Sequence, residues 1–384
     1  MSDVVEVESL AAGGAGIAHL PDGMIVFVPR TAPGDRVTLG EVRRHKRHAE
    51  ARAAEIVAPG PGRIAPRCPH FTADRCGGCQ WQHIEYAEQL RAKAAIVGNA
   101  LRRIGGLDVA DPDVVPSPRP FGYRTTITLT VRRYGPRIIA GFHDAFDPNR
   151  VFMLGACPIA RDEVNALWQE TKPKLGALPQ GDDVRLKLRV GRDGRRLVAA
   201  SEGKEEWRGF GDDAPDESAW GFLQVNEEVA ALLHAAVVES AGPGKRVLDL
   251  YAGAGDTALP LAAAGHEVVL VEMDSRAAKQ AAVAAKAAGL KVKCIVGRVE
   301  DHLTHLLPAD VVIVNPPRTG LSEEVTGRLR VCASARLVYV SCDPATLARD
   351  LKRLGVAADR IDLVRAYDMF PQTSHVETMI VIRP

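Results

Sequence analysis

The chain has 384 residues, of which 46% are hydrophobic, and its 49 Lys and Arg against 48 Asp and Glu leave a formal charge of +1. This length predicts two or three domains at roughly 100 to 200 residues each, and the near-zero charge excludes a uniformly basic nucleic-acid binder, so any such surface must arise from local clusters. No apolar run reaches the roughly 18 residues of a membrane span. The N-terminus MSDVVEVESL has neither the basic n-region nor the apolar h-region of a secretory signal, so a cytoplasmic protein is expected.

Residues 1–60 consist of short β-rich runs separated by Gly, Pro and Asp, a pattern typical of a small OB-like β-barrel. Asp22-Gly23 is a strong hairpin turn, because both residues tolerate the left-handed backbone that two-residue turns require. The stretch GGAGIAHLPDGMIVFVPRTAPGD resembles a TRAM domain, a small RNA-binding barrel. The first 60 residues are therefore expected to form an RNA-binding barrel domain.

A basic run, RRHKRHAEAR, occupies residues 43–52 at the end of this segment. On an isolated strand such a run is usually a solvated face, but on a small barrel it forms a phosphate-binding edge. Both interpretations stay open from the sequence. The four cations concerned are Arg43, Arg44, Lys46 and Arg47.

Seven cysteines in a chain without a secretory signal favour metal binding or catalysis over disulfides. Three of them, in CPHFTADRCGGC, have the spacing C-x7-C-x2-C, and a fourth, in LGACPIA, is followed by proline like the first. Four thiolates fit either zinc or an iron–sulfur cluster, and the wide x7 loop with a distant fourth ligand favours iron–sulfur. Cys294 and Cys332 lie in apolar or helical patterns and are expected to be core thiols. The candidate ligands are Cys68, Cys76, Cys79 and Cys157.

Residues 61–215 are expected to form a mixed α/β middle domain that carries the metal centre and contacts RNA. Two of its strands, in YRTTITLTVRR and VRLKLRV, alternate apolar and polar residues, as strands with one buried face do. Arg185, Lys187 and Arg189 share the polar face of the second strand, where either carboxylates on a neighbouring strand or RNA phosphates must neutralise them. The residues expected in the core are Ile127, Leu129, Val131, Val184, Leu186, Leu188 and Val190.

Residues 216–384 alternate strand and helix patterns, which is typical of a doubly wound, Rossmann-like parallel sheet. In RVLDLYAGAGDTALPLAAAG a strand runs into a glycine loop, where Gly253 and Gly255 permit a close approach of the backbone to a ligand. The next strand, EVVLVEMD, ends in Glu272, which is placed to accept hydrogen bonds from ribose hydroxyls. Because the spacing lacks the full G-x-G-x-x-G, an adenosine-bearing ligand is expected here rather than a dinucleotide.

A strictly apolar strand in DVVIVNPPRTGLSEEV ends at Asn315, at the edge of the sheet that faces the ligand crevice. The two prolines that follow stiffen the loop and remove backbone donors from it. An Asn-Pro-Pro loop also occurs in methyltransferases that act on exocyclic amines. That activity is therefore an alternative interpretation of this part of the chain.

The strand LVYVS delivers Cys342 to the same edge of the sheet, directly before a helix. Asp343 suits the N-cap and Pro344 the first helical turn, and the positive end of the helix is expected to lower the pKa of the thiol. A buried structural cysteine is the alternative, but these features favour a nucleophile. His375 and Glu377 come just before or at the start of the last apolar strand, in SHVETMIVI.

Together these motifs resemble the S-adenosylmethionine-dependent RNA uridine-5-methyltransferases, over nearly the whole chain. The matching stretches are the TRAM-like barrel, CPHFTADRCGGCQWQH, GFLQVN, VLDLYAGAGDTALPLA, VEMD, NPPRTGL, SCDPATLARDL and PQTSHVET. The resemblance implies that the four cysteines hold a 4Fe-4S cluster, that Cys342 adds to carbon 6 of the uracil and that Glu377 is the base. The residues it implies around S-adenosylmethionine are Gln224, Tyr251, Gly253, Asp256, Glu272 and Asn315.

The chain departs from the usual pattern of this family at two positions, with Asp256 in place of Asn and Asn315 in place of Asp. These departures change the charge of the expected pocket and are the only support for a second alternative, an inactive RNA-binding scaffold. The TRAM-like barrel and the cysteines make the chain more similar to the ribosomal RNA enzymes of the family than to the transfer RNA enzymes, which as a group lack both. The resemblance therefore implies 23S rRNA as the substrate, with transfer RNA as the alternative, and a monomer without an obligatory protein partner.

Overall fold

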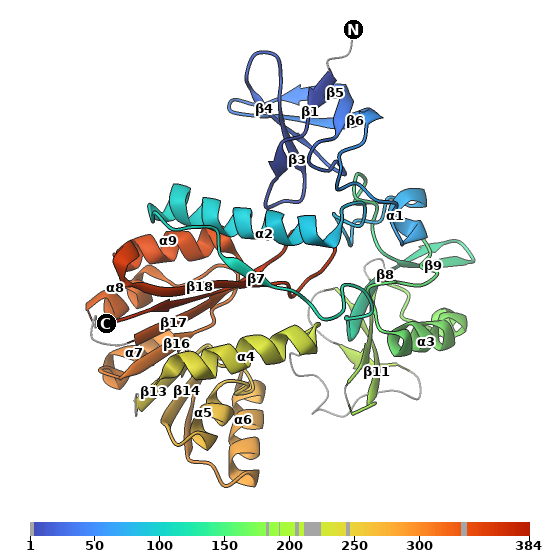
Figure 1. The fold of residues 1–384 in the computed structure, drawn as a ribbon. Coiled ribbons are helices and arrows are strands. Elements are labelled where there is room, and N and C mark those ends of the chain that lie inside the picture. Colours follow the sequence, from blue (N-terminus) through green and yellow to red (C-terminus); the bar gives the residue numbers. More distant parts are fainter. Residues whose placement is uncertain are drawn as a thin grey trace.

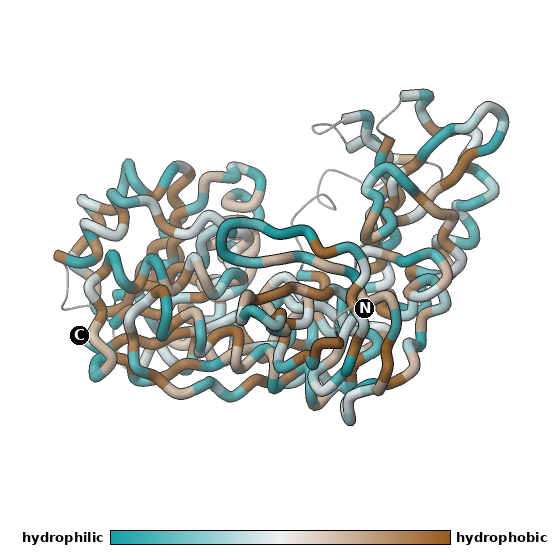
Figure 2. Tube along the Cα trace, turned by 90° about the horizontal axis from the view of Figure 1, so that it is seen from above, coloured by the Kyte–Doolittle hydropathy of each residue, from teal (hydrophilic) through white to brown (hydrophobic). Residues whose placement is uncertain are grey.

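The computed structural model describes residues 4–181, 184–191, 193–203, 207–210, 224–242, 246–331 and 336–384. These residues form three β-sheets, with helices packed on the second and third (Figure 1). Seen from above, the C-terminus lies at one end of the molecule (Figure 2). Among the described residues, no helix has both the length and the apolar character that crossing a membrane requires.

The N-terminal sheet consists of six strands: β1 Val4–Glu6, β2 Ser9–Leu10, β3 Gly16–His19, β4 Ile25–Val28, β5 Arg36–Arg44 and β6 Ala49–Ala58. Their order across the sheet is β1-β5-β6-β4-β3-β2. Asp22 and Gly23 lie in the turn between β3 and β4, as the sequence predicts, with Gly23 at a φ of 82°. Apolar residues of β1 and β3 share one core with those of β4, β5 and β6, so the sheet curls around its own interior.

The second sheet is built from β8 Thr126–Tyr134, β9 Arg137–Gly141, β10 Val184–Val190, β11 Arg196–Glu202 and β12 Arg208–Gly209. It is antiparallel, in the order β12-β11-β10-β8-β9, and α3 (Asp162–Thr171) shares its core. The chain around it also forms the short helix α1 (Pro69–Ala73) and a 3-10 helix (Lys172–Ala177). The predicted alternation is confirmed, because the seven expected core residues of β8 and β10 are all buried.

The third sheet consists of β7 Asp113–Val115, β13 Arg246–Leu250, β14 Glu267–Glu272, β15 Val292–Val296, β16 Val311–Val314, β17 Arg336–Ser341, β18 Ile361–Tyr367 and β19 Glu377–Ile382. The helices around it are α2 Tyr86–Ala100, α4 Glu227–Ala241, α5 Ala258–Ala263, α6 Ser275–Ala287, α7 Val299–Leu306, α8 Glu323–Val331 and α9 Pro344–Leu354, with a 3-10 turn at Ala358–Arg360. The strand order is β15-β14-β13-β16-β17-β19-β18-β7, and β13 to β17 are parallel.

Helices cover both faces of this third sheet. One face shares a core with α4, α5 and α6, and the other shares a core with α2, α7, α8 and α9 (Figure 1). β19 runs antiparallel between β17 and β18. The C-terminal part therefore has the doubly wound α/β methyltransferase fold that the sequence predicts.

One helix and one strand of the expected middle domain, residues 61–215, belong to the third sheet instead. α2 buries Ile96 and Val97, and Val97 lies in a core with residues of α9. Just after it, β7 pairs with β18, with Val114 opposite Ala366. A helical period shows which face of α2 is buried but not which core it meets, so the sequence could not assign this segment. The expected boundary between 215 and 216 lies outside the described residues.

Buried polar contacts attach the N-terminal sheet to the cysteine-bearing segment. Arg30 has a left-handed backbone, with a φ of 62°, and its guanidinium donates hydrogen bonds to the carbonyl oxygens of Phe71 and Cys76. Asp35 is fully buried and forms an ion pair with Arg63, with 2.6 Å between the closest atoms. Because both charges are shielded from water, these contacts fix the orientation of the sheet more firmly than exposed pairs would.

Candidate active site and cysteine centre

A large pocket opens at the carboxyl ends of β13, β14, β16 and β17, which is where doubly wound sheets bind ligands. Its volume is about 1000 Å³. All eight catalytic and cofactor residues chosen from the sequence line it, although they come from five strand ends and one preceding loop. They are Gln224, Tyr251, Gly253, Asp256, Glu272, Asn315, Cys342 and Glu377.

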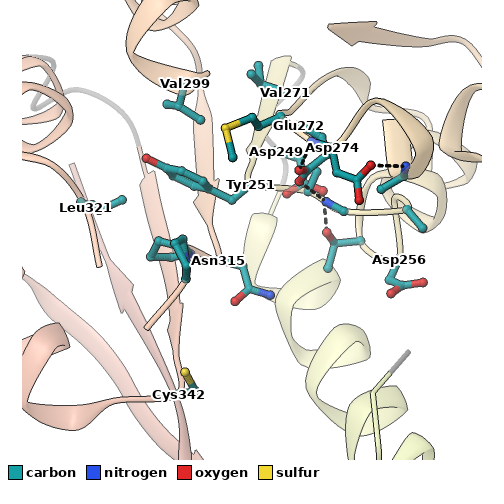
Figure 3. A pocket seen from close by; sticks show the side chains of 18 of the residues that line it. Asp249, Tyr251, Asp256, Val271, Glu272, Asp274, Val299, Asn315, Leu321 and Cys342 are labelled. Carbon is teal, nitrogen blue, oxygen red and sulfur yellow. Dashed lines mark hydrogen bonds between the residues drawn. The ribbon is translucent and has the colours of Figure 1, made fainter. Parts of the chain in front are cut away.

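The pocket has two chemically different ends (Figure 3). Glu272, Asp249 and Asp274 gather at one end, and Cys342 lies at the other, with Asn315 between them. The acidic end offers acceptors for hydroxyl and ammonium groups, whereas the thiol end offers a nucleophile. An elongated ligand in this pocket therefore contacts hydrogen-bond acceptors at one end and approaches the thiol at the other. The pocket also has room for a second molecule beside the thiol.

The loop after β13 has an unusual backbone that shapes the acidic end. Tyr251 has a φ of 60°, a left-handed conformation that is rare for a residue with a side chain and is found mostly at functional sites. Gly253 and Gly255 are also left-handed, and a Cβ on Gly255 would lie 3.2 Å from Ala281 Cβ of α6. The left-handed backbone at both glycines gives the loop its tight course, and the predicted close approach of this backbone to a ligand stays a prediction.

Glu272 holds this loop in place through its carboxylate. One oxygen accepts a hydrogen bond from the Gly253 amide at 2.8 Å, and the other accepts one from the Asp274 amide at 2.7 Å. A carboxylate has about four acceptor positions, so Glu272 can still accept a hydrogen bond from a ribose hydroxyl. The same residue can therefore fix the loop and bind the ligand.

Two polar residues of this end were missed from the sequence. Asp249 is buried inside β13, where Thr257 Oγ1 donates to it at 2.5 Å, and burial raises its pKa to about 7. His234 of α4 lines the pocket near Asp256; burial lowers the pKa of His234, and the charge of Asp256 opposes that shift. Asp249 lies in an apolar strand pattern and His234 in an apolar helix, so neither pattern indicated a ligand site.

Cys342 follows β17 and precedes α9, as predicted, and Asp343 caps the helix by accepting from the Thr346 amide at 2.8 Å. The expectation that the helix lowers the thiol pKa is wrong for the protein without ligands. Burial and the nearby carboxylate of Glu377 raise the pKa of Cys342, and Arg318 opposes this through its charge and a hydrogen bond. The helix dipole is a fraction of a charge, so it does not offset burial beside a carboxylate.

Glu377 is the first residue of β19 and is only 7% exposed. Ser341 pairs with Thr378 across the antiparallel ladder, and one further step in this register brings Cys342 opposite Glu377. Burial raises the pKa of Glu377 to about 7, and Arg318 acts in the opposite direction. A carboxylate with a pKa near 7 is well matched to proton transfer at neutral pH.

Arg318 is the third residue of the thiol end, and no role for it was predicted from the sequence. It follows the two prolines after β16, lines the pocket, and acts on the ionisation of both Cys342 and Glu377. A fixed guanidinium here stabilises negative charge on either group and on a bound ligand. The position of Arg318 after Asn315-Pro316-Pro317 was visible in the sequence, but the sequence did not show that its side chain lines the pocket.

The four candidate ligand cysteines line a second, smaller cavity of about 240 Å³. Each is less than a tenth exposed, and burial raises the pKa of each thiol, that of Cys76 to about 12. The Gly78 amide donates to Cys76 Sγ at 3.4 Å, and Gln82 Nε2 donates to Cys79 Sγ at 3.3 Å. Donors aimed at sulfur are typical of thiolates that hold a metal centre.

The spread of these sulfurs distinguishes between the two kinds of centre. Around a single tetrahedral zinc with Zn–S bonds of about 2.3 Å, ligand sulfurs lie about 4 Å apart. Among the described residues, the only group of three potential ligand atoms within 4.8 Å of one another is at His45, His48 and Glu50. No three of the four cysteine sulfurs are gathered this closely, as the ligands of one tetrahedral zinc ion would be.

Cys294 and Cys342 are not among the residues that line this cavity. Cys294 is in the edge strand β15, where it is partly buried and packs against the core shared with α4, α5 and α6, so the expectation of a core thiol is met in part. Cys332 lies outside the described residues.

Two basic surfaces keep their cations exposed or half-exposed. Arg43, Lys46 and Arg47 are exposed or half-exposed at the tip of the β5–β6 hairpin, whereas Arg44 is paired with Asp22 at 2.6 Å. We call the first three the hairpin cluster. This hairpin is the edge that the sequence left open between a solvated face and a phosphate-binding site.

The second basic surface is the polar face of β10. The residues opposite Lys187 on the neighbouring strands are Thr128 and Ala199, not carboxylates. Lys187 Nζ lies 3.9 Å from the centre of the Trp207 ring, and burial together with neighbouring arginines lowers its pKa to about 8. On the described strands, therefore, no carboxylate lies directly opposite Lys187, and an aromatic ring lies beside it.

The sequence matches known proteins along almost its full length. The family model described as tRNA (Uracil-5-)-methyltransferase matches residues 290–383. An uncharacterized RNA methyltransferase of Gloeobacter violaceus is 34% identical, with 98% of this chain and 95% of the relative covered. A 23S rRNA (uracil(1939)-C(5))-methyltransferase, RlmD, of Thiobacillus denitrificans is 31% identical, with 99% of each chain covered.

A solved structure resembles the whole fold as well. It is the tRNA (uracil-54, C5)-methyltransferase of Pyrococcus abyssi in complex with S-adenosyl-L-homocysteine. Its TM-score is 0.75 at 26% identity, and the alignment covers 99% of this chain and 100% of that one. The likeness therefore extends over all three sheets.

Proposed function

The chain belongs to the S-adenosylmethionine-dependent RNA (uracil-5-)methyltransferases, and from this we propose that it methylates carbon 5 of one uridine through a covalent adduct on Cys342. The observation that carries the proposal is that Cys342, just after β17, and Glu377, at the start of the paired strand β19, line the same pocket as the expected cofactor residues, with the charge of Glu377 acting on the Cys342 thiol. A nucleophile and a base at one end of a cofactor site are what this reaction requires.

The acidic end of the pocket fits the cofactor. S-adenosylmethionine, when bound, supplies the methyl group from its sulfonium. Glu272 would hold the ribose, and the left-handed loop from Tyr251 to Gly255 offers backbone amides close to the ligand. Gln224, Asp256 and Asn315 line the same space. Asp256 is exposed and lies near enough to His234 for its charge to act on that ring, so water can solvate the carboxylate that stands where the family usually has Asn.

The chemistry at the thiol end begins with addition. Carbon 5 of uracil is a poor nucleophile, so the Cys342 thiolate first forms a bond to carbon 6, and the electron pair of the 5,6 double bond moves toward oxygen 4 as an enolate. The enolate carbon 5 then takes the methyl group. Arg318 is placed to stabilise the thiolate before addition, which counteracts the unfavourable burial of that charge.

Elimination completes the reaction. The Glu377 carboxylate removes the proton from carbon 5, the electron pair re-forms the 5,6 double bond, and the bond from carbon 6 to sulfur breaks to release the Cys342 thiolate. Because a target uridine stacked inside folded RNA cannot reach Cys342, the base must leave its stack and enter the pocket. The volume of about 1000 Å³ accommodates both the cofactor and one nucleoside.

The proposed substrate is 23S rRNA, with transfer RNA as the alternative. The N-terminal sheet and the four cysteines support a ribosomal substrate, as in the family resemblance. The architecture alone does not separate the two, because the solved structure that aligns over its full length is named a transfer RNA enzyme. Mass-spectrometric mapping of 5-methyluridine in ribosomal and transfer RNA, from strains with and without this gene, tests the assignment directly.

An amine-directed methyltransferase is the second candidate, because Asn315 begins an Asn-Pro-Pro loop at the pocket. Such an enzyme needs neither a thiol nor a base, since its nucleophile is already on the substrate. It leaves the pairing of Cys342 with Glu377 without a function. We therefore favour methylation of carbon 5.

We also propose that the cysteine cavity holds a 4Fe-4S cluster, so anaerobically purified protein should be brown and contain iron and sulfide. Cys79→Ser should lose the cluster and loosen the second sheet, but retain affinity for S-adenosylhomocysteine within about twofold, because the cavity and the cofactor pocket lie in separate cores. Cys294→Ser, outside the cavity, is the matched control and should keep its iron. One equivalent of zinc without iron would contradict the proposal.

The hairpin cluster should contribute to RNA affinity by binding phosphates. Replacing Arg43, Lys46 and Arg47 with Ala should weaken RNA binding and reduce the slope of log affinity against log salt by roughly 0.7 to 0.9 for each phosphate that is no longer bound. Filter binding at several salt concentrations measures the slope. Arg353→Ala, which removes an Arg of α9 that pairs with Glu323, is the control for loss of a surface cation elsewhere and should leave the slope unchanged. An unchanged slope in the triple variant would identify an ordinary solvated hairpin.

A further inference from the structure

The segment from Phe370 to Val376 leads directly into Glu377 and is held from both sides. Gln372 in this segment has a left-handed backbone, with a φ of 69°, and is only 3% exposed. A buried residue keeps such a conformation only when its surroundings fix it. We call residues 370–376 the base loop, because its path sets where the Glu377 carboxylate lies.

Gln89 of α2 holds the base loop through a reciprocal amide pair. Its Oε1 accepts from the Gln372 amide at 3.0 Å, and its Nε2 lies 3.0 Å from Gln372 Oε1. The same Nε2 also contacts the carbonyl oxygens of Trp81 and Ile84 at 3.2 and 2.9 Å. Gln89 is completely buried, so no water replaces these hydrogen bonds when they are removed.

The cysteine-bearing segment also forms hydrogen bonds to the base loop at Gln372. The amides of Gln80 and Trp81, directly after Cys79, both donate to the Gln372 carbonyl at 3.1 and 3.0 Å. Tyr123 donates its hydroxyl to the carbonyl of Pro371 at 3.1 Å. The base loop is therefore fastened to the cysteine centre as well as to α2.

The N-terminal sheet meets the same junction. The Trp81 ring nitrogen donates to the Gly14 carbonyl at 2.9 Å, and a Cβ on Gly14 would lie 2.7 Å from Gln80 Cβ and 3.5 Å from Ser374 Oγ. The loop at Gly14 thus packs against the Gln80-Trp81 segment, which in turn holds the base loop. Within the described residues, Gln89 is the side chain that hydrogen-bonds both the base loop and the Trp81 segment.

We propose that Gln89 is a positioning residue for the general base: its amide pair with Gln372 fixes the base loop, and through it the Glu377 carboxylate, for removal of the proton from carbon 5. This proposal rests on the proposed function. Gln89 does not line the cofactor pocket, so its effect on the reaction passes through the base loop and Glu377. A misplacement of about 1 Å costs a reacting group on the order of 100-fold in rate.

The test is Gln89→Met, which nearly keeps the side-chain volume but removes the hydrogen bonds that the Gln89 side chain makes to the base loop. In single-turnover reactions with RNA, formation of the covalent adduct and affinity for S-adenosylhomocysteine should stay within about twofold of the parent protein. Resolution of the methylated adduct should slow by about 100-fold. Amide hydrogen exchange should rise over residues 370–377. Thr171→Val, which removes a buried hydroxyl contact in α3, is the matched control and should resolve the adduct normally.

Gln372→Met gives a second measurement if Gln89→Met does not fold, because it removes only the side-chain half of the pair. The two variants and their combination form a double-mutant cycle, and the slowing of resolution should be non-additive. A folded variant that resolves the adduct at the parental rate, or that slows adduct formation equally, overturns the positioning role. Failure of the covalent mechanism itself would instead appear as methylation by Cys342→Ala, whatever Gln89 does.

Discussion

Replacing Cys342 with Ala should abolish both methyl transfer to RNA and the covalent adduct. Without the thiolate, carbon 5 never becomes an enolate, so the loss should reach at least about 10⁴-fold in the single-turnover rate. S-adenosylhomocysteine should still bind with affinity within about twofold, because Cys342 lies at the opposite end of the pocket from Glu272 (Figure 3). Transfer of a labelled methyl group and denaturing gel electrophoresis of the protein with RNA measure the two losses separately.

The control for this experiment is Cys294→Ser, which changes a thiol on the edge strand β15 away from the pocket and should keep full activity. A Cys342→Ala protein that still methylates carbon 5 would refute the covalent mechanism. Methylation of an exocyclic amine by both proteins would instead support the activity suggested by the Asn315 loop. An inactive scaffold would give neither the adduct nor the product with the parent chain.

Features fixed by neighbouring residues were predictable from the sequence. The alternation in β8 and β10 follows from the period of a strand, and Asp343 caps α9 because a short carboxylate before a proline-led helix meets free amides. The gathering of the expected cofactor and catalytic residues at one edge was predictable for a related reason. Parallel strands end on the same side of a sheet, so residues at strand ends meet even when they are far apart in the chain.

Features that depend on distant partners were not predictable. The sequence pattern of α2 shows an apolar face but no sign that Gln89 pairs with Gln372, which is 283 residues away. The ionisation of Cys342 depends on burial and on the opposing effects of Glu377 and Arg318, none of which follows from the helix start beside it. Sequence patterns around each reacting group were therefore enough to predict it. The residues that position these groups and shift their pKa values could be recognised only from the three-dimensional structure.

Glu377→Gln should trap the protein on its RNA. The variant keeps Cys342 and can still form the adduct and accept the methyl group, but without a carboxylate the carbon 5 proton stays and the sulfur is not expelled. A protein–RNA adduct that survives denaturing gel electrophoresis should therefore accumulate to near one equivalent, whereas turnover should fall by at least about 10²-fold. Glu239→Gln, at the end of α4 outside the pocket, is the matched control and should turn over normally. A Glu377→Gln protein that neither turns over nor traps RNA would contradict the assignment of the base.

The pKa of Glu377 adds a pH dependence with a defined sign. Its pKa is raised by burial from 4.5 to about 7 in the folded protein, so folding favours the protonated carboxyl. Below pH 4.5 the group is protonated in both states and has no effect, but as pH rises through about 7 the folded protein loses up to about 3 kcal/mol of stability. Glu377→Gln should remove this loss, so the stability of the variant relative to the parent protein, measured by urea unfolding, should grow between pH 5 and pH 8.

Resolution of the adduct by the parent protein should rise over the same range, because only the carboxylate accepts the proton. Stability is lost while the unfolded chain ionises and the folded protein does not, and the loss is complete once Glu377 ionises in the folded protein, which is also what activates the base. A variant with no growing advantage over this range would show that the pKa of Glu377 is not raised in the folded protein.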